Sequence, residues 1–353
     1  MCENDCGKAV NIQEDQRMIS IKDVANACGV SVSTVSKALN GHRDVSANKR
    51  DYIRAKAKEL GYSPNSYARA LKTNRTHNIG VLFMDQARSG LTHDYFAHVL
   101  NAFKTTAEKS GYDITFIMSN ADGSSPMTYL EHCRFRGFDG IIIACVDFRD
   151  TEVQELMQSN IPVVIIDYIY SRTISILSDN MQGMKSLTQY AIDRGHRKIA
   201  YFYGEDSMVT ADRLAGFFIT MEENGVAVND NYIKEIKYRN TKLAEHATLE
   251  LLTSDNPPTC IFYPDDYSAF GGINAIRRLG LRIPDDISIA GFDGINLAMQ
   301  LEPRLTTVVQ NTARIGECAA EKLISLIEHP RTTVIDQTVI GTRLDEGSTI
   351  GQI

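Results

Sequence analysis

From residue 78 onward, short apolar runs alternate with longer amphipathic stretches, and this alternation limits the possible folds more than any other feature. The runs at 79–84, 140–145, 162–167 and 287–293 have the length of buried strands, and helical periodicity separates them. Two rounds of strand and helix predict two parallel sheets covered by helices. Right-handed crossovers would then gather the carboxyl ends of the strands, where ligands commonly bind.

Charge is distributed unevenly along the chain. Residues 19–77 hold 11 lysine and arginine residues against 4 acidic ones, a net charge of +7, whereas residues 78–353 hold 24 against 36, a net charge of −12. The overall charge of −7 therefore conceals a small basic module in front of a large acidic body. A localised basic module predicts contact with the phosphates of a nucleic acid.

The basic module carries the pattern of a helix-turn-helix domain. Ser20 and Asp23 predict a capping box for a first helix, and Gly29 lies in the middle of a tight turn. Ser31 predicts the cap of a second helix, and a third helix is expected over residues 46–60. Two short helices joined by a glycine turn are typical of DNA-binding heads.

The outward face of the second helix carries small or cationic side chains, which suit entry into a DNA major groove. Any lysine here also has a plainer interpretation, as a solvated surface residue. The residues of this module that we expect to contact DNA are Val32, Ser33, Thr34, Ser36, Lys37 and Asn48.

The stretch from Ser63 to Thr76 predicts a helix of about two turns, with Pro64 at its first position. Such a helix is too short to be stable alone in water, where roughly 12–15 residues are already marginal. It also carries Leu71 among basic side chains. A helix that is marginal alone is suited to folding only when it binds.

The segment beginning "IKDVANACGVSVSTVSKALNG" and ending "SPNSYARALKTNRT" resembles the N-terminal signature of the lactose-repressor (LacI/GalR) family of transcription regulators. The resemblance implies a helix-turn-helix domain over 19–62 and a hinge helix and linker over 63–77. In this family the hinge folds on the operator, where a leucine from each subunit wedges into the minor groove. The hinge residues that it implies in DNA binding are Tyr67, Ala68, Leu71 and Lys72.

Acidic residues end several predicted strands. Asp167, Asp265 and Asp293 each have a plain explanation, because polar residues commonly finish strands and cap helices. The alternative is that they converge in one cleft with Arg213, which opens a predicted helix. Carboxylates and an arginine recognise vicinal hydroxyl groups through charge-assisted hydrogen bonds.

The motifs "DRGHRKIAYFYG", "DRLAGF", "GLRIPDDISIAGFD" and "LEPRLTTVVQN" resemble landmarks of the same family's effector domain, which has a periplasmic-binding-protein fold. The resemblance implies a two-subdomain α/β domain. Its N-subdomain would hold about 78–177 and 311–331, and its C-subdomain about 178–310 and 332–353. The implied effector contacts are Tyr95, Phe96, Asp167, Tyr168, Arg213, Asp265 and Asp293.

Two departures from the family pattern leave the effector open. The first loop, "MDQARSGLTHDYF", lacks the usual Asn-Pro, and a glycine follows Asp293. Carboxylates with an arginine favour a sugar or sugar derivative, and a nucleobase remains an alternative. The family scheme implies a homodimeric repressor on a near-palindromic operator, and it fits an inducer as well as a co-repressor.

Other features of the sequence limit the class of protein to which the chain can belong. The chain has no run of 18 apolar residues, and residues 1–18 read as a disordered leader rather than a signal peptide, so we expect a cytoplasmic protein. Seven scattered cysteines argue for reduced thiols, and we expect neither a metal nor a cofactor. Residues 78–353 alone would also fit a solute-binding protein. An enzyme is disfavoured because no phosphate-binding loop appears.

Overall fold

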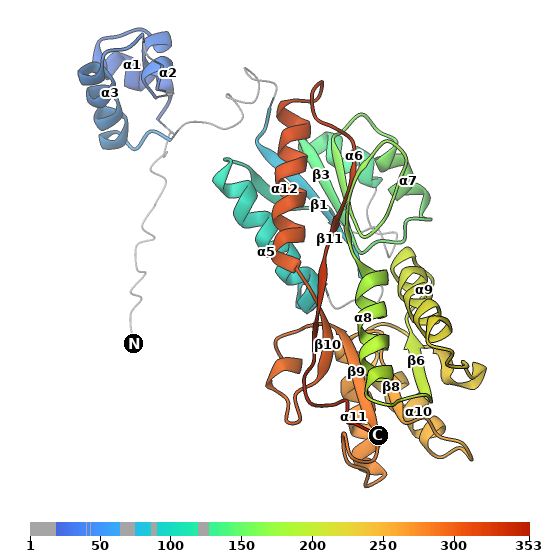
Figure 1. Ribbon diagram of the computed structural model, residues 1–353. Coiled ribbons are helices and arrows are strands. Elements are labelled where there is room, and N and C mark those ends of the chain that lie inside the picture. The colour runs from blue at the N-terminus through green and yellow to red at the C-terminus, as the bar shows by residue number, and fades with distance from the viewer. Residues whose placement is uncertain (1–18, 40, 43, 64–74, 86–89, 119–126) are drawn as a thin grey trace, which may run out of the picture. The chain divides into compact units, whose positions relative to one another are not determined.

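The computed structural model describes residues 19–39, 41–42, 44–63, 75–85, 90–118 and 127–353. It divides into two compact units, Met1–Thr76 and His77–Ile353. The first unit is helical and the second is built from two sheets, as the alternation of runs predicts (Figure 1). The hinge residues 64–74, with the predicted DNA contacts Tyr67, Ala68, Leu71 and Lys72, lie outside the described residues.

The described residues of the first unit form three helices, α1 (Ile21–Cys28), α2 (Val32–Leu39) and α3 (Ala47–Glu59). The predicted capping box is confirmed: the Ser20 amide donates to Asp23 Oδ2 at 2.8 Å, and the Asp23 amide donates back to Ser20 Oγ at 3.4 Å. Gly29 ends α1 with φ of 62°, which a residue with a Cβ rarely adopts. The three helices share a small core of Val24, Ala25, Val35, Ala38, Val45, Ile53 and Ala57.

The N-subdomain of the second unit is a parallel sheet of order β11-β5-β4-β3-β1-β2. Successive residues of its central strands enter opposite cores, because side chains alternate along a strand. Ile142 and Ala144 face one core, whereas Ile141 and Ile143 face the other. Its strands are β1 (Asn78–Phe83), β2 (Asp113–Phe116), β3 (Gly140–Ala144), β4 (Val163–Ile166), β5 (Ile174–Ser178) and β11 (Gln337–Ile340).

Two pairs of helices cover this sheet. Helices α5 (Asp94–Lys109) and α12 (Thr312–Glu328) lie side by side on one face, although more than 200 residues separate them in sequence (Figure 1). Gly316 allows this close approach, since a Cβ there would lie 2.2 Å from the Val99 carbonyl oxygen. Helices α6 (Tyr129–Arg136) and α7 (Thr151–Met157) cover the other face.

The C-subdomain repeats this layout with the order β12-β10-β9-β8-β6-β7, in which β12 is antiparallel to β10. Its strands are β6 (Ile199–Tyr203), β7 (Ile233–Glu235), β8 (Cys260–Phe262), β9 (Ser288–Asp293), β10 (Thr306–Gln310) and β12 (Thr342–Asp345). One face is covered by α8 (Asn180–Asp193) and α9 (Met208–Glu223), the other by α10 (Thr241–Leu252) and α11 (Asp266–Arg278). Short 3-10 turns lie at Gly90–Thr92, Asp230–Tyr232 and Ala298–Gln300.

The chain crosses between the subdomains three times, at β5–α8, β10–α12 and β11–β12. The expected assignment of 332–353 to the C-subdomain is wrong for β11, which pairs with β5 in the N-subdomain sheet, so the third crossing comes only at Gly341. The first and third crossings are joined, because the Asp179 amide donates to the Ile340 carbonyl at 2.9 Å and Thr342 Oγ1 donates to the Asp179 carbonyl at 3.2 Å.

A search of the described residues finds no helix whose length and apolar character would allow it to cross a bilayer.

Candidate functional site

A cavity of about 400 Å³ lies between the N- and C-subdomains, where parallel strands of both sheets end. All seven residues predicted to contact an effector line it: Tyr95, Phe96, Asp167, Tyr168, Arg213, Asp265 and Asp293. The structure therefore confirms that these residues converge. That they contact an effector remains a prediction.

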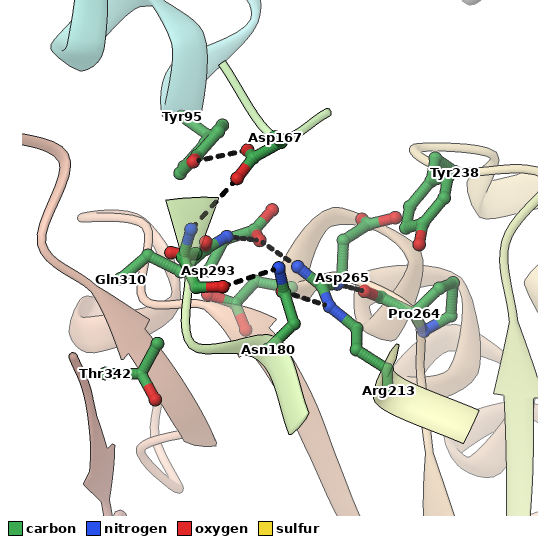
Figure 2. Close-up of polar contacts among 12 residues, drawn as sticks. Tyr95, Asp167, Asn180, Arg213, Tyr238, Pro264, Asp265, Asp293, Gln310 and Thr342 are labelled. Carbon is green, nitrogen blue, oxygen red and sulfur yellow. Dashed lines mark hydrogen bonds and ion pairs between the residues drawn. The ribbon is translucent and has the colours of Figure 1, made fainter. Parts of the chain in front are cut away.

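Arg213 is the buried cation of this cavity, with 3% of its surface exposed. It lies in the second turn of α9, and its Nε donates to Asn180 Oδ1 at 2.9 Å. Its Nη1 donates to the Pro264 carbonyl at 2.8 Å, and its Nη2 lies 3.6 Å from Asp293 Oδ1 (Figure 2). These contacts from three different segments fix the plane of the guanidinium group.

Asp293 ends β9 and has φ of 106°, outside the range that strands adopt. Its Oδ1 accepts a hydrogen bond from Gln310 Nε2 at 2.7 Å. Burial raises the pKa of Asp293 to about 7, and the positive charge of Arg213 opposes that rise. The carboxyl group can therefore change its charge near neutral pH.

Asp167 follows β4 and also has a positive φ, of 56°. Its Oδ2 accepts from the Tyr95 hydroxyl at 2.9 Å and its Oδ1 from the Ser178 amide at 3.1 Å (Figure 2). Burial raises the pKa of Asp167, and these two hydrogen bonds oppose the rise. Ser178 is the last residue of β5, just before the first crossing. Its hydrogen bond therefore connects Asp167 to the segment that joins the two subdomains.

Asp265 behaves differently from the other two acids. It caps α11, and it accepts from the Ser268 amide at 2.7 Å, the Ser268 hydroxyl at 2.9 Å and the Arg239 amide at 2.8 Å. The plainer expectation, that an acid after a strand caps the next helix, is therefore confirmed here. Three donors from the protein leave this carboxylate less able to accept from a ligand.

Aromatic side chains form one side of the cavity. The Tyr168 ring is stacked on Phe148, with centroids 3.9 Å apart and an interplanar angle of 3°. Tyr95 and Phe96, at the start of α5, meet edge to face at 4.8 Å. The cavity thus combines flat apolar surface with carboxylates and a fixed arginine.

Most of the other lining residues were not predicted from the sequence, among them Phe148, Tyr238 and Gln310. Tyr238 follows β7 and Gln310 ends β10, so a rule that took polar and aromatic residues at strand ends, as well as acidic ones, would have found them. Gln310 Oε1 is buried and has no hydrogen-bond partner within the part of the chain that the structure describes. It is an acceptor beside the cavity.

Two contacts at the rim of the cavity join the subdomains. Arg239, after β7, lies 3.8 Å from Asp94 Oδ2 and donates to the Thr92 carbonyl at 3.3 Å. Arg149, after β3, lies 3.6 Å from Asp206 Oδ2. The Arg239 side chain is 9% exposed and the Arg149 side chain 70%, so the first contact is shielded and the second is solvated.

The predicted DNA-contacting face of the first unit is solvent-facing. Val32 is 39% exposed, and Ser33, Lys37 and Asn48 are exposed as well. Thr34 is partly engaged, because its amide donates to Ser31 Oγ at 3.2 Å. The Lys37 ammonium is 2.5 Å from Asp44 Oδ2, a contact that the local sequence pattern does not predict.

Comparison with known proteins supports the assignment of both units. Residues 20–65 match the family described as bacterial regulatory proteins, lacI family, and residues 188–350 match a periplasmic binding protein-like domain. The HTH-type transcriptional repressor PurR of Yersinia pestis (strain Pestoides F) is 32% identical over 335 residues, which cover 92% of this chain and 96% of that protein. The same figures hold for PurR of Yersinia pseudotuberculosis serotype O:1b (strain IP 31758).

Solved structures share the fold. The lac repressor dimer bound to operator and the anti-inducer ONPF matches with a TM-score of 0.81 and 24% identity, over 95% of this chain and 100% of that one. The transcriptional regulator CelR in complex with cellobiose matches with 0.68 and 23%, over 94% and 99%. A LacI family regulator from Enterococcus faecium with bound ribose matches with 0.67 and 23%, over 78% and 99%.

Proposed function

This chain belongs to the lacI family of bacterial regulatory proteins and is a DNA-binding transcriptional repressor, not an enzyme, and from that premise we propose that its small-molecule effector is an uncharged carbohydrate. The observation that carries this proposal is the surplus of hydrogen-bond acceptors around the cavity. Asp293, Asp167 and Gln310 all place carboxylate or amide oxygens there. A sugar supplies many hydroxyl donors to such a lining.

The fixed guanidinium group of Arg213 supports the same conclusion. One sugar hydroxyl can accept from Arg213 Nη2 and donate to Asp293, while its neighbour donates to Gln310 Oε1, which has no partner among the described residues. Charge-assisted hydrogen bonds of this kind are roughly twice as strong as neutral ones. Because the acceptors and the cation are held before binding, little ordering cost remains.

The aromatic wall gives the effector an apolar face to pack on. The stacked Phe148–Tyr168 pair offers a flat surface for the C–H face of a pyranose or furanose ring. A nucleobase would also stack there, and the relatives named PurR make it the competing candidate. Proteins of this fold are known with cellobiose and with ribose.

Charge argues against a phosphorylated effector. Among the described residues, seven carboxylates and three arginines line the cavity, so their combined field is negative even with Asp293 protonated. An anionic phosphate ester would therefore be repelled. The proposal is specific to neutral sugars.

Members of the family bind operator DNA as dimers, and we propose the same for this chain, with Val32, Ser33, Thr34, Ser36, Lys37 and Asn48 in adjacent major grooves. The proposed hinge contacts, Tyr67, Ala68, Leu71 and Lys72, would lie in the minor groove between them. The effector acts through its different affinity for the two subdomain orientations.

Calorimetric titration of the full-length protein tests the effector. The ligand set should contain neutral mono- and disaccharides, their phosphate esters and free purine bases. We expect saturable binding of a neutral sugar and at least tenfold weaker binding of its phosphate ester. Binding of a purine base alone, or tighter binding of the ester, would overturn the proposal. Selection of operators from random DNA, with and without the bound sugar, then shows whether it is an inducer or a co-repressor.

A further inference from the structure

Three side chains with different metal-binding atoms converge on the N-subdomain side of the cavity. Asp85 follows β1 and Cys145 follows β3, and these strands are neighbours that end together at the pair Phe83–Ala144. His93 is the N-cap residue of α5. The carboxylate oxygen, the imidazole nitrogen and the thiol sulfur all lie within 4.8 Å of one another.

The His93 ring is the second, independent observation. The residue is 8% exposed, and its Nδ1 is buried without a hydrogen-bond partner among the residues that the structure describes. Its ring is held edge to face against Phe96, with centroids 5.0 Å apart. A buried imidazole nitrogen normally has a partner, so an unsatisfied one requires an explanation. A metal ion bound through this nitrogen would supply the missing partner.

The donor set selects the class of ion. A thiolate and an imidazole are ligands for zinc and similar transition metals, whereas magnesium and calcium prefer oxygen alone. Metal–ligand bonds of about 2.0–2.3 Å place tetrahedral ligand atoms roughly 3.5 Å apart. The ligand atoms would therefore have to approach one another by at most about 1.3 Å, a distance that rotations about the side-chain χ angles can cover.

We propose that Asp85, His93 and Cys145 form a three-ligand site for zinc or a chemically similar divalent ion. The fourth coordination position opens into the cavity that all three residues line, so a water molecule or an effector oxygen completes the tetrahedron. On binding, the Cys145 thiol releases its proton to solvent and the sulfur coordinates as thiolate. The carboxylates of the lining favour a cation, and Arg239, which opposes it, is paired with Asp94.

This proposal does not depend on the effector being a sugar. The site is built from protein atoms alone, and the ion can be titrated with no effector present. Sequence spacing gives no hint of it, because the ligands are 8 and 52 residues apart. Its failure would leave the carbohydrate proposal standing, since the Arg213 side of the cavity shares none of these residues.

Titration with Co²⁺ and Zn²⁺ tests the site. Every protein should be full length and carry Cys2→Ser and Cys6→Ser, so that the leader thiols do not bind metal, and should be freed of metal with a chelator. We expect one ion per chain, a sulfur-to-cobalt charge-transfer absorption band, and displacement of cobalt by zinc. Absence of that band, or stoichiometric binding without it, would overturn the proposal.

Variants locate the ligands. Cys145→Ser should abolish the charge-transfer band, and His93→Gln and Asp85→Asn should each weaken Co²⁺ binding at least tenfold. Cys133→Ser is the matched control, because Cys133 is a buried thiol of the same subdomain that does not line the cavity, and it should bind as the parent does. Circular dichroism checks that each variant is folded. If the Cys145 or His93 variant misfolds, Asp85→Asn, at a partly buried position, still tests whether the site binds metal. Unchanged affinity in Cys145→Ser would refute the assignment.

Discussion

The guanidinium carbon of Arg213 lies 3.6 Å from the centroid of the Phe292 ring, so the cation of the cavity is stacked on the strand that also carries Asp293. Phe292 is fully buried in the C-subdomain core, so its ring fixes the position of the guanidinium face that packs on it. The edges of the guanidinium group are held by Asn180 and Pro264. Its charge is therefore presented to the cavity in one orientation.

Arg213→Ala should weaken effector binding about 10- to 100-fold, since a hydrogen bond to a charged group contributes about 1.5–3 kcal/mol. Operator affinity without effector should change little, because the residue lies in the effector domain. Arg213→Lys should lose nearly as much, because an ammonium cannot reproduce the planar set of contacts. Calorimetry and operator gel shifts measure the two quantities. Arg331 is exposed, and Arg331→Ala is the control. An effector titration that is unchanged in Arg213→Ala would exclude the proposed role of Arg213.

Asp293 predicts a pH dependence of stability. Its folded pKa of about 7 lies above the ordinary 3.8, so between pH 4 and 7 the folded state holds a proton that the unfolded chain has released. Stability contributed by this group therefore falls as pH rises through that window, by at most about 1.4 kcal/mol per pH unit. Denaturant unfolding of wild type and Asp293→Asn measures it. The variant should lose this slope, and parallel curves for the two proteins would contradict the assignment.

Effector binding should release a proton near pH 6–7. A sugar hydroxyl that donates to Asp293 favours the ionised carboxylate, so affinity should rise with pH up to about 7 and level off above it. Calorimetry in buffers of different ionisation enthalpy counts the released protons. Asp293→Asn should release none, and a wild-type affinity that is flat from pH 5.5 to 8 would show that this carboxyl group does not take part.

The shielded rim contact between Arg239 and Asp94 should stabilise the closed cavity. Asp94→Asn should speed effector release two- to fivefold, consistent with about 0.2–1 kcal/mol for a partly exposed ion pair. Stopped-flow release kinetics measure this change. Asp206→Asn makes the same kind of change at the solvated contact with Arg149 and should have a smaller effect on effector release. Equal changes in the rate of effector release would mean that the lower exposure of the Arg239–Asp94 contact does not make it more stabilising than the Arg149–Asp206 contact.

Asp44 should restrain Lys37 on the DNA-contacting face. Asp44→Asn frees the ammonium that now lies 2.5 Å from the carboxylate. We expect tighter binding to random DNA and a salt slope steeper by about 0.9, the value for one added phosphate contact. Asp51→Asn makes the same change in net charge on exposed α3, and it should leave the slope unchanged. Identical slopes for both variants would indicate a general charge effect.

Leu71→Ala should weaken binding to the operator far more than binding to random DNA. The proposed wedge contributes only where the duplex is kinked, and unstacking a base step costs a few kcal/mol that the wedge offsets. Competition gel shifts with operator and random duplexes give the ratio. A loss of the same size on both duplexes would argue against insertion.

Local rules predicted the elements whose signals are local. The capping box of Ser20 and Asp23, the left-handed Gly29 and the buried runs of the central strands all follow from neighbouring residues. Strand β11 was assigned to the wrong subdomain because its partner, β5, lies some 160 residues away and β11 itself is half exposed. Pairing over such a distance has no local signature.

The candidate site also contains features that local sequence rules predict and features that they do not. Strand ends identified Asp167 and Asp293 because parallel strands finish at one edge. They could not show that Asp265 is occupied as a helix cap, or that Asp44 holds Lys37, because both depend on side-chain directions. The cluster of Asp85, His93 and Cys145 has no sequence signature, because its members are 8 and 52 residues apart along the chain and meet only in three dimensions.

The three crossings also have a consequence for biosynthesis. Helix α12 supplies Ile315, Ala319 and Leu323 to the N-subdomain core, so on a ribosome that core stays open until residues beyond 328 have emerged. The C-subdomain sheet in turn lacks β12 until Asp345 has emerged, and nascent chains that stall earlier would expose apolar surface. Limited proteolysis of ribosome-arrested nascent chains should find protease resistance of both subdomains only after residue 345 has left the exit tunnel.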